Sequence, residues 1–157
     1  TTESELLENA KTGYSDLDIY TAAQGIKTFS TGVFASHWLE MAKTRLYNDD
    51  PSATWTLHRI FRDLLSILSP VCPFFTHHLS TTLYEKSAVD VDTFPEKPLS
   101  KTSDFTSMTD SLIEFNSEVW KAKKDAGISL AAPITGHKVP GSLESIEQAL
   151  VSMHKLE

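Results

Sequence analysis

Apolar residues recur at helical spacing along most of the chain. The clearest case lies between Pro51 and Pro70, where apolar side chains repeat every three or four residues. These residues are Leu57, Ile60, Phe61, Leu64, Leu65 and Leu68. The pattern predicts an amphipathic helix over about 51–69, because proline fits a first helical turn and a second proline ends the helix.

The same periodicity predicts helices on both sides of this one. They cover about 4–11, 17–47, 74–86 and 104–125. Gly13 is expected in a turn. Gly25 and Gly32 each weaken the long helix by about 1 kcal/mol relative to alanine, so they would permit either close approach of another helix or a bend near 30–32. Gly127 suits the C-terminal cap of the fourth of these helices. Residues 87–103, with two X-Pro pairs, are expected to be irregular.

The pattern changes after Pro133. A short extended segment is expected over 134–139, followed by a last helix that Ser142 would cap. The predicted fold class is therefore all-α: an antiparallel helical bundle of four to five helices over 1–134. Residues 135–157 would form a small C-terminal appendage, or else part of an α+β subdomain.

Composition limits the possible functions. The chain has 157 residues, which fits one domain, and a net charge of −7, which by itself disfavours a nucleic-acid partner. However, the balance over residues 27–62 is +2, so a local basic surface is possible. Cys72 stands alone, which excludes an internal disulfide and a cysteine-rich zinc site. No apolar run is long enough for a transmembrane helix, and no membrane partner is expected.

Motifs of catalysis are missing from the sequence. There is no phosphate-binding loop, dinucleotide fingerprint, H-E-x-x-H or G-x-S-x-G motif. His77 and His78 are adjacent, so they point to different helix faces; one is expected to pack and the other to be exposed. No targeting signal is visible, and the start at Thr1 rather than methionine suggests a piece of a larger protein. Composition and spacing alone predict a helical binding module.

Four segments together carry a family resemblance. They are F-A-S-H-W-L-E-M-A-K-T-R-L-Y at 34–47, L-L-S-I-L-S-P-V-C-P-F-F-T at 64–76, Phe94-Pro95, and V-W-K-A-K-K-D-A-G-I-S-L at 119–130. Their order and spacing resemble the anticodon-binding domain of class I aminoacyl-tRNA synthetases of the valyl, isoleucyl and leucyl group. The last segment is most similar to the archaeal valyl type. His78 and Ser69 depart from the family pattern, which often has Glu and His there.

The resemblance implies a tRNA partner, and it implies that catalysis is carried out by other domains. The partner would be tRNA, most simply valine tRNA, and the catalytic domains would belong to the same parent chain in the cytoplasm. The signatures H-I-G-H and K-M-S-K-S are absent, so this chain alone should be inactive and need no cofactor or metal. The parent would be an ATP-dependent aminoacyl-tRNA ligase. The family's preceding helix, with a K-L-x-N-like segment, is also absent here, and some anticodon contacts would lie on it.

Single-stranded RNA loops are bound by stacking on aromatic or arginine planes and by neutralising phosphates. Three groups have suitable residues: Trp55, Arg59 and Arg62; Lys43 and Arg45; and Lys121 and Lys124. The first group is spaced by four and three, so it forms one helical stripe away from the leucine face. For every group a structural role is also open, with Trp55 packed, the arginines paired with acids, or the lysines serving the helix dipole. Trp38 and Trp120 are expected in the core.

The leading hypothesis is thus the tRNA anticodon-binding domain of the valyl enzyme. The same domain of an isoleucyl or leucyl enzyme is the alternative within the family. A helical protein-interaction module without RNA binding is the alternative outside it, and steep salt dependence of tRNA binding separates the two. An independent enzyme would need a pocket of perturbed titratable groups.

Overall fold

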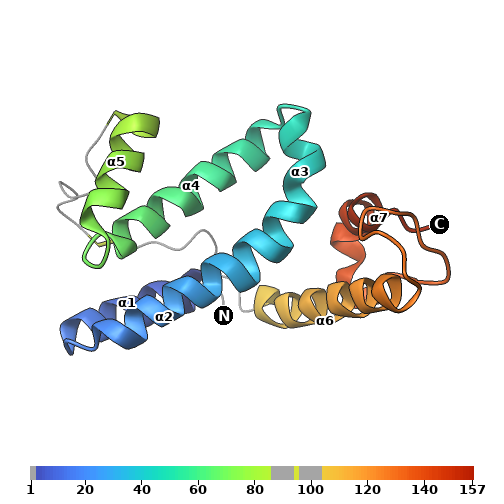
Figure 1. Ribbon diagram of the computed structural model, residues 1–157, viewed down its shortest axis with the longest axis horizontal. Helices are drawn as coiled ribbons and strands as arrows, with labels where there is room; N and C mark the ends of the chain where they lie inside the picture. The colour runs from blue at the N-terminus through green and yellow to red at the C-terminus, as the bar shows by residue number, and fades with distance from the viewer. Residues whose placement is uncertain (1–2, 86–93, 96–103) are drawn as a thin grey trace. The chain divides into compact units, whose positions relative to one another are not determined.

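The computed structural model describes residues 3–85, 94–95 and 104–157, apart from the side chains of 104–107, and Figure 1 shows its helices. In chain order they are α1 (Glu3–Ser15), α2 (Ile19–Thr28), the π-helix η1 (Phe29–Leu39), α3 (Glu40–Tyr47), α4 (Pro51–Leu68), α5 (Pro73–Tyr84), α6 (Asp104–Asp125), the 3-10 helix η2 (Gly141–Ile146) and α7 (Glu147–His154). The described ranges hold no strand, only an isolated bridge between Ile134 and Leu156. The predicted all-α class is confirmed.

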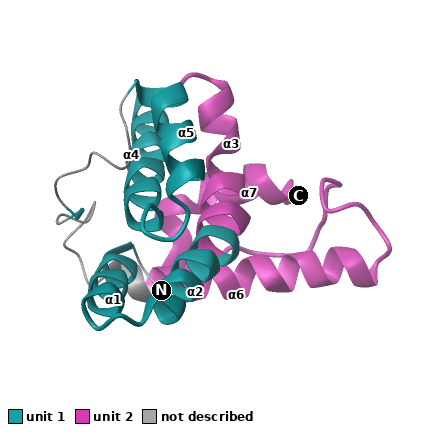
Figure 2. Ribbon diagram, turned by 60° about the vertical axis from the view of Figure 1, so that its left-hand side comes forward, with its two compact units in different colours: residues 1–32, 51–101 teal, residues 33–50, 102–157 magenta. Residues whose placement is uncertain are grey.

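The first of two compact units contains residues 1–32 and 51–101, drawn in teal in Figure 2. In it α1 lies along α2, and α4 packs against α1, α2 and α5. Gly13 allows the close approach of α1 and α2, because a Cβ there would lie 3.0 Å from the Cβ of Ala22. Gly13 belongs to the last turn of α1, so the turn predicted at this residue is wrong. The chain turns after it, and Asp18 caps α2 by accepting from the Thr21 amide.

The bounds predicted for α4 are confirmed to within one residue, because Pro51 and the Pro70 turn define them locally. Its apolar face is also confirmed, with Ile60, Leu64 and Leu65 buried. The buried arc is wider than the leucine pattern indicated, since Ile67 is fully buried as well. The Pro70–Pro73 segment turns the chain into α5, as expected.

The predicted long helix is helical from Ile19 to Tyr47, but its middle is π-helical from Phe29 onward. Two side-chain hydroxyls, those of Ser30 and Thr31, lie at the start of the π-helical part. Their hydroxyls donate to the carbonyls of Ile26 and Lys27, at 2.7 and 2.9 Å. Those are the i−4 carbonyls that an α-helix would give to backbone amides, and such side-chain bonds compete with the regular ladder.

The helix predicted over 74–86 is confirmed as α5, but the aligned residues Phe75, Leu79 and Leu83 do not form a buried face within its unit. Phe75 is 57% exposed and Leu83 is 52% exposed, while Phe74 beside them is 90% exposed. Within the described part of its unit, α5 packs against α4. Its helical pattern shows an apolar stripe but does not show whether a partner covers it.

The second unit contains residues 33–50 and 102–157, drawn in magenta in Figure 2. In this unit α3 contacts α7, and α6 contacts η2. Its core joins two residues of α6 to two of the tail. They are Phe115, Val119, Leu143 and Leu150. The bounds predicted for α6 are confirmed, and Gly127 (φ +68°) ends it as expected.

The tail after residue 134 packs on α6 through two fully buried leucines, Leu143 and Leu150. The helix cap predicted at Ser142 is wrong: η2 begins at Gly141 after Pro140, and no side chain caps it. The division of the chain at residue 134 stays a prediction.

Candidate nucleic-acid interface

The stripe predicted on α4 carries an exposed aromatic and a stacked arginine. Trp55 is 61% exposed, so the expectation that it packs in a core does not apply within its unit. Arg62 is exposed, and its guanidinium carbon lies 4.4 Å from the centroid of the Tyr84 ring. This cation–π contact holds the guanidinium plane in one orientation and leaves its charge without an ion-pair partner among the described residues.

Arg59 has a different role from Arg62. Its Nε donates to Asp63 Oδ2 at 2.9 Å, and the side chain of Asp63 is only 12% exposed. A buried carboxylate without a cation would be strongly unfavourable, so Arg59 serves the fold by compensating it. The structure therefore separates the two arginines that the sequence placed in one group.

Tyr84 and His58 were not foreseen as parts of this stripe. The Tyr84 hydroxyl lies 2.9 Å from His58 Nδ1, and the two rings meet edge to face. Burial raises the pKa of Tyr84, with Arg62 acting in the opposite direction, so the phenol stays neutral. No local signal could find this group, because the packing of α5 on α4 brings Tyr84 to the stripe.

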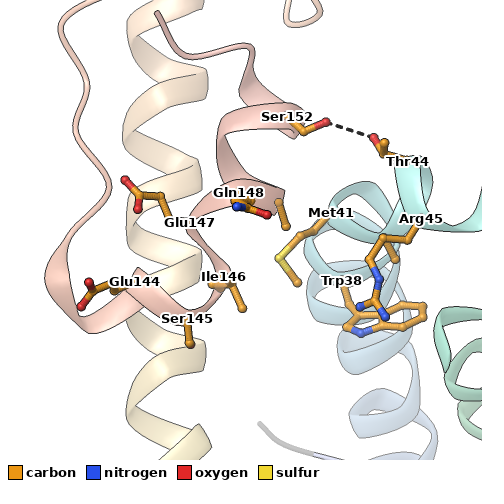
Figure 3. Close-up of a pocket in the computed structure, with 12 residues that line it drawn as sticks. Trp38, Met41, Thr44, Arg45, Glu144, Ser145, Ile146, Glu147, Gln148 and Ser152 are labelled. Carbon is orange, nitrogen blue, oxygen red and sulfur yellow. Dashed lines mark hydrogen bonds between the residues drawn. The ribbon is translucent and has the colours of Figure 1, made fainter. Parts of the chain in front are cut away.

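The second unit has a cavity of about 710 Å³ between helix α3 and the tail, shown in Figure 3. Trp38, Met41 and Arg45 line it from η1 and α3. From the tail come residues 144–149 and Ser152, and the Ser152 hydroxyl meets that of Thr44 at 3.1 Å. Trp38, expected in the core, is half-buried here and stacks on Phe34 with centroids 5.3 Å apart.

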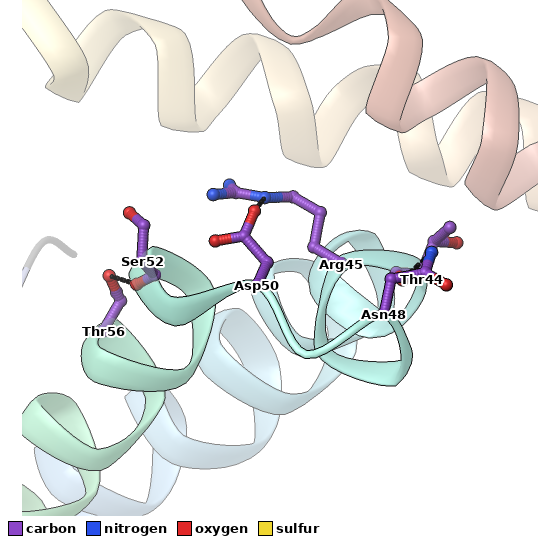
Figure 4. Close-up of polar contacts among 6 residues, drawn as sticks. All are labelled: Thr44, Arg45, Asn48, Asp50, Ser52 and Thr56. Atoms are coloured by element: carbon purple, nitrogen blue, oxygen red, sulfur yellow. Dashed lines mark hydrogen bonds and ion pairs between the residues drawn. The ribbon is translucent and has the colours of Figure 1, made fainter.

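Lys43 and Arg45 are both paired with acids close by in sequence. Lys43 donates to both oxygens of Glu40 at 2.6 Å, which is the first cause of its raised pKa. Arg45 donates to Asp50 at 2.8 Å across the turn before α4, as Figure 4 shows. Both pairs are partly exposed, so each adds little stability, but the carboxylate offsets the positive charge that the cation would offer to a phosphate.

The basic run at the end of α6 divides into two kinds of lysine. Lys121 and Lys124 are exposed and have no ion pair among the described residues. Lys123 is fully buried, and its ammonium donates to the carbonyls of Leu130 (2.8 Å) and His154 (2.7 Å). Burial lowers the pKa of Lys123, and Lys155 adds to the effect. The sequence did indicate that Lys123 is buried. It follows Phe115 and Val119 at intervals of four residues, so it lies on the same helix face as these two buried residues.

Buried polar side chains connect α6 to two other helices of this unit, η1 and α7. The Asn116 amide donates to His37 Nδ1 at 2.9 Å, and its oxygen accepts from His154 Nε2 at 2.7 Å. Trp120 lies against both histidines, with ring centroids 5.3 and 5.7 Å away. Burial lowers the pKa of His154 to about 4 and also lowers that of His37, so both rings are neutral near pH 7. These buried hydrogen bonds connect α6 to His37 of η1 and to His154 of α7.

The described residues contain no group of three or more His, Cys, Asp or Glu side chains able to hold a metal ion. The expectation that one of His77 and His78 packs is wrong, because both are exposed. Among the described helices, none is both long and apolar enough to cross a membrane.

The arrangement is that of a helical domain with exposed aromatic and basic side chains. The family model for the anticodon-binding domain of tRNA ligase matches residues 3–138. The chain belongs to this family, and the resemblance inferred from the four sequence segments is confirmed.

Similar proteins are valine–tRNA ligases. The chain is 32% identical over 164 residues to that of Aeropyrum pernix, covering 96% of this chain and 20% of the relative. It is 32% identical over 153 residues to that of Nanoarchaeum equitans, with the same coverage. The enzyme of Pyrobaculum aerophilum is 30% identical over 128 residues, 76% of this chain and 16% of the relative. The chain thus spans a fifth or less of the length of these curated relatives.

Proposed function

We propose that this chain is the anticodon-binding part of a valine–tRNA ligase and that it binds the anticodon loop of valine tRNA. The observation that carries the proposal is the 32% identity to valine–tRNA ligases over 96% of the chain. The domain would dock the tRNA so that its distant acceptor end reaches catalytic domains elsewhere in the parent chain. Its contribution is positioning, and ATP would be bound by those other domains in the cytoplasm.

The distribution of charge supports an RNA partner in spite of the net charge of −7. The cations Arg62, Lys121 and Lys124 are exposed and unpaired by acids in the described part of the chain. Trp55 offers an exposed aromatic face on the same helix as Arg62. Exposed aromatics combined with cations are what single-stranded loops require.

The test is binding of a valine tRNA transcript at low and at moderate salt, compared with the same transcript carrying altered anticodons. We expect binding that weakens with salt and weakens further when the anticodon is changed. An isoleucine tRNA transcript is the control for specificity, and tighter binding of it would move the assignment to the isoleucyl enzyme. Absence of binding at low salt would contradict the proposal.

A protein contact is a second candidate role, favoured by one observation. Phe74, Phe75 and Leu83 leave an apolar stripe of α5 exposed, which is unusual for a surface that meets only water. In the proposed parent enzyme this stripe would meet another domain of the same chain. A helical module that serves only this purpose would bind proteins and show no salt-dependent tRNA affinity.

A further inference from the structure

The cavity of the second unit borders that unit's hydrophobic core. Met41 and Ile146 line the cavity and also pack against the buried core cluster. Trp38 and Ala149 complete the apolar lining, and all four residues are only half-buried. The volume of about 710 Å³ lies within the range of roughly 300–1,000 Å³ that is usual for binding pockets. The cavity therefore offers an apolar wall that is continuous with the core.

The charged side chains at the cavity lie at its border, outside the apolar lining. Figure 3 shows the carboxylates of Glu144 and Glu147 directed away from the wall that η1 and α3 form. Neither carboxylate has an ion-pair partner among the described residues. The cation at the opposite edge, Arg45, is paired with Asp50 at 2.8 Å. The lining is thus neutral, and the border on the side of the tail carries two uncompensated negative charges.

This distribution of charge decides which class of partner fits. A nucleic acid would bring its phosphates toward the two carboxylates, which is unfavourable. A protein segment fits both features if it inserts one large apolar side chain and carries lysine or arginine on either side of it. Large side chains that fill a pocket supply most of the affinity in such contacts, and charge pairs at the border add attraction and selectivity.

We propose that this cavity is a docking site for a protein segment in which a large apolar residue is flanked by basic residues. The apolar side chain would lie between Trp38 on one wall and Ile146 on the other. The flanking cations would pair with Glu144 and Glu147 outside the cavity. Docking of this kind needs no RNA, so the site would serve whether or not the chain binds tRNA.

The probe is a displayed library of random short peptides, selected for binding to the full 157-residue chain. We expect the selected peptides to contain one Phe, Leu or Trp with Lys or Arg within about one helical turn of it. Replacing that apolar residue by alanine should weaken binding at least about tenfold, measured by fluorescence anisotropy. Replacing the cations by glutamine should weaken it about three- to tenfold, and added salt should weaken binding of the unaltered peptide.

Two variants of the chain test whether the selected peptides bind in the cavity. Glu144→Gln with Glu147→Gln removes the border charge, so it should weaken binding about three- to tenfold and remove most of its salt dependence. Ser152→Arg adds bulk and positive charge at an exposed position of the cavity lining, so it should weaken binding at least about tenfold. Glu114→Gln with Glu118→Gln, two exposed changes on α6 outside the cavity lining, is the matched control and should behave as the unaltered chain.

Thermal melts check that each variant is folded, and if Ser152→Arg is not, the Gln pair decides. If either folded variant binds the selected peptides as tightly as the unaltered chain, the cavity is not their site and the inference is overturned. Selection of acidic or uncharged peptides, or of no peptide at all, overturns it as well.

An RNA occupant gives a different result in the same variants. An added cation should not weaken tRNA binding unless its side chain blocks a contact, so weaker tRNA binding by folded Ser152→Arg would assign the cavity to RNA and overturn the inference. Absence of tRNA binding by the unaltered chain would contradict the proposed function alone, because the peptide measurements do not involve tRNA.

Discussion

At the scale of single residues, Lys123 connects the end of α6 to the tail. Its ammonium group is the hydrogen-bond donor to two backbone carbonyls, those of Leu130 and His154. Lys123→Met keeps most of the side-chain volume but leaves both carbonyls without this donor. We expect a loss of about 1–3 kcal/mol in the free energy of unfolding, measured by urea denaturation.

The neighbouring Lys124 provides the control, because it is exposed on the same helix. Lys124→Met should change the free energy of unfolding by no more than about 0.5 kcal/mol. Equal stability of the two variants would mean that desolvation of the buried ammonium offsets what its hydrogen bonds contribute.

His154 makes the stability of the second unit depend on pH. Its Nε2 donates to Asn116, so its Nδ1 is unprotonated, and Nδ1 is buried with no hydrogen-bond partner among the described residues. The lowering of its pKa from 6.5 to about 4 follows from burial first, and then from the charges of Lys123, His137 and His37. The folded state therefore binds fewer protons than the unfolded state between these two pH values.

The sign of the effect follows from this proton difference. Stability should be constant above about pH 7 and fall as the pH drops from 6.5 toward 4, by up to about 3 kcal/mol. Urea denaturation at several pH values measures this decrease. His154→Gln should flatten it, while His78→Gln, a change at an exposed histidine, should leave it intact. An unchanged profile in His154→Gln would assign the pH dependence to other groups.

At the scale of elements, two glycines of the first unit provide a matched pair. A Cβ at Gly13 would lie 3.0 Å from the Ala22 Cβ and 3.1 Å from the Asp18 carbonyl, neither of which can rotate away. Gly13→Ala should therefore separate α1 from α2 and cost about 1–3 kcal/mol. At Gly25 the nearest atom would be a Leu6 methyl at 3.9 Å, an ordinary contact. Gly25→Ala should be neutral or stabilise by up to about 1 kcal/mol, because helix propensity improves.

Thermal or urea unfolding of the two alanine variants measures this difference directly. If Gly13→Ala were as stable as Gly25→Ala, α1 and α2 would have to be farther apart than the contact at Gly13 indicates.

The helix ends that could be predicted are those that local chemistry determines. Pro51, the Pro70 turn and Gly127 act on their own neighbours, so α4 and α6 were predicted nearly to the residue. The π-helical change at Phe29, where the Ser30 and Thr31 hydroxyls donate to the carbonyls of Ile26 and Lys27, was not predicted beyond a bend. The exposure of the apolar side chains of α5 could not be predicted either. Helical spacing shows that they lie on one face of the helix, but it does not show whether another element covers that face.

The candidate site was predictable in part for the same reason. The spacing of Trp55 and Arg62 on one helix was correct, and both are exposed there. The pairing of Arg59 with Asp63 is also a short-range contact, and the sequence left it open as an alternative. Tyr84 beside Arg62 and the tail side of the cavity depend on segments brought together by folding, so no spacing rule could find them.

At the scale of the whole molecule, the proposed function requires an acidic chain to bind RNA through a few cations that lack an ion-pair partner among the described residues. Arg62, Lys121 and Lys124 lack ion-pair partners in the described part, whereas Arg59 is committed to a buried carboxylate. Arg62→Ala should therefore weaken tRNA binding and reduce the salt slope by about 0.7, the value for one phosphate on a single strand. Lys121→Ala with Lys124→Ala should reduce the slope by about twice that amount.

Arg59→Ala tests whether Arg59 contacts the RNA directly or only stabilises the fold. It should lower the free energy of unfolding, because Asp63 loses its cation, while the salt slope of the fraction that remains folded stays the same. Arg62→Lys adds a second control, since lysine retains the charge but loses the planar stack on Tyr84. If the slope is kept and affinity still falls, the guanidinium plane itself stacks on a base. If neither Arg62 variant changes affinity, Arg62 does not contact the RNA. The loop would then be bound by the second unit, which contains α6.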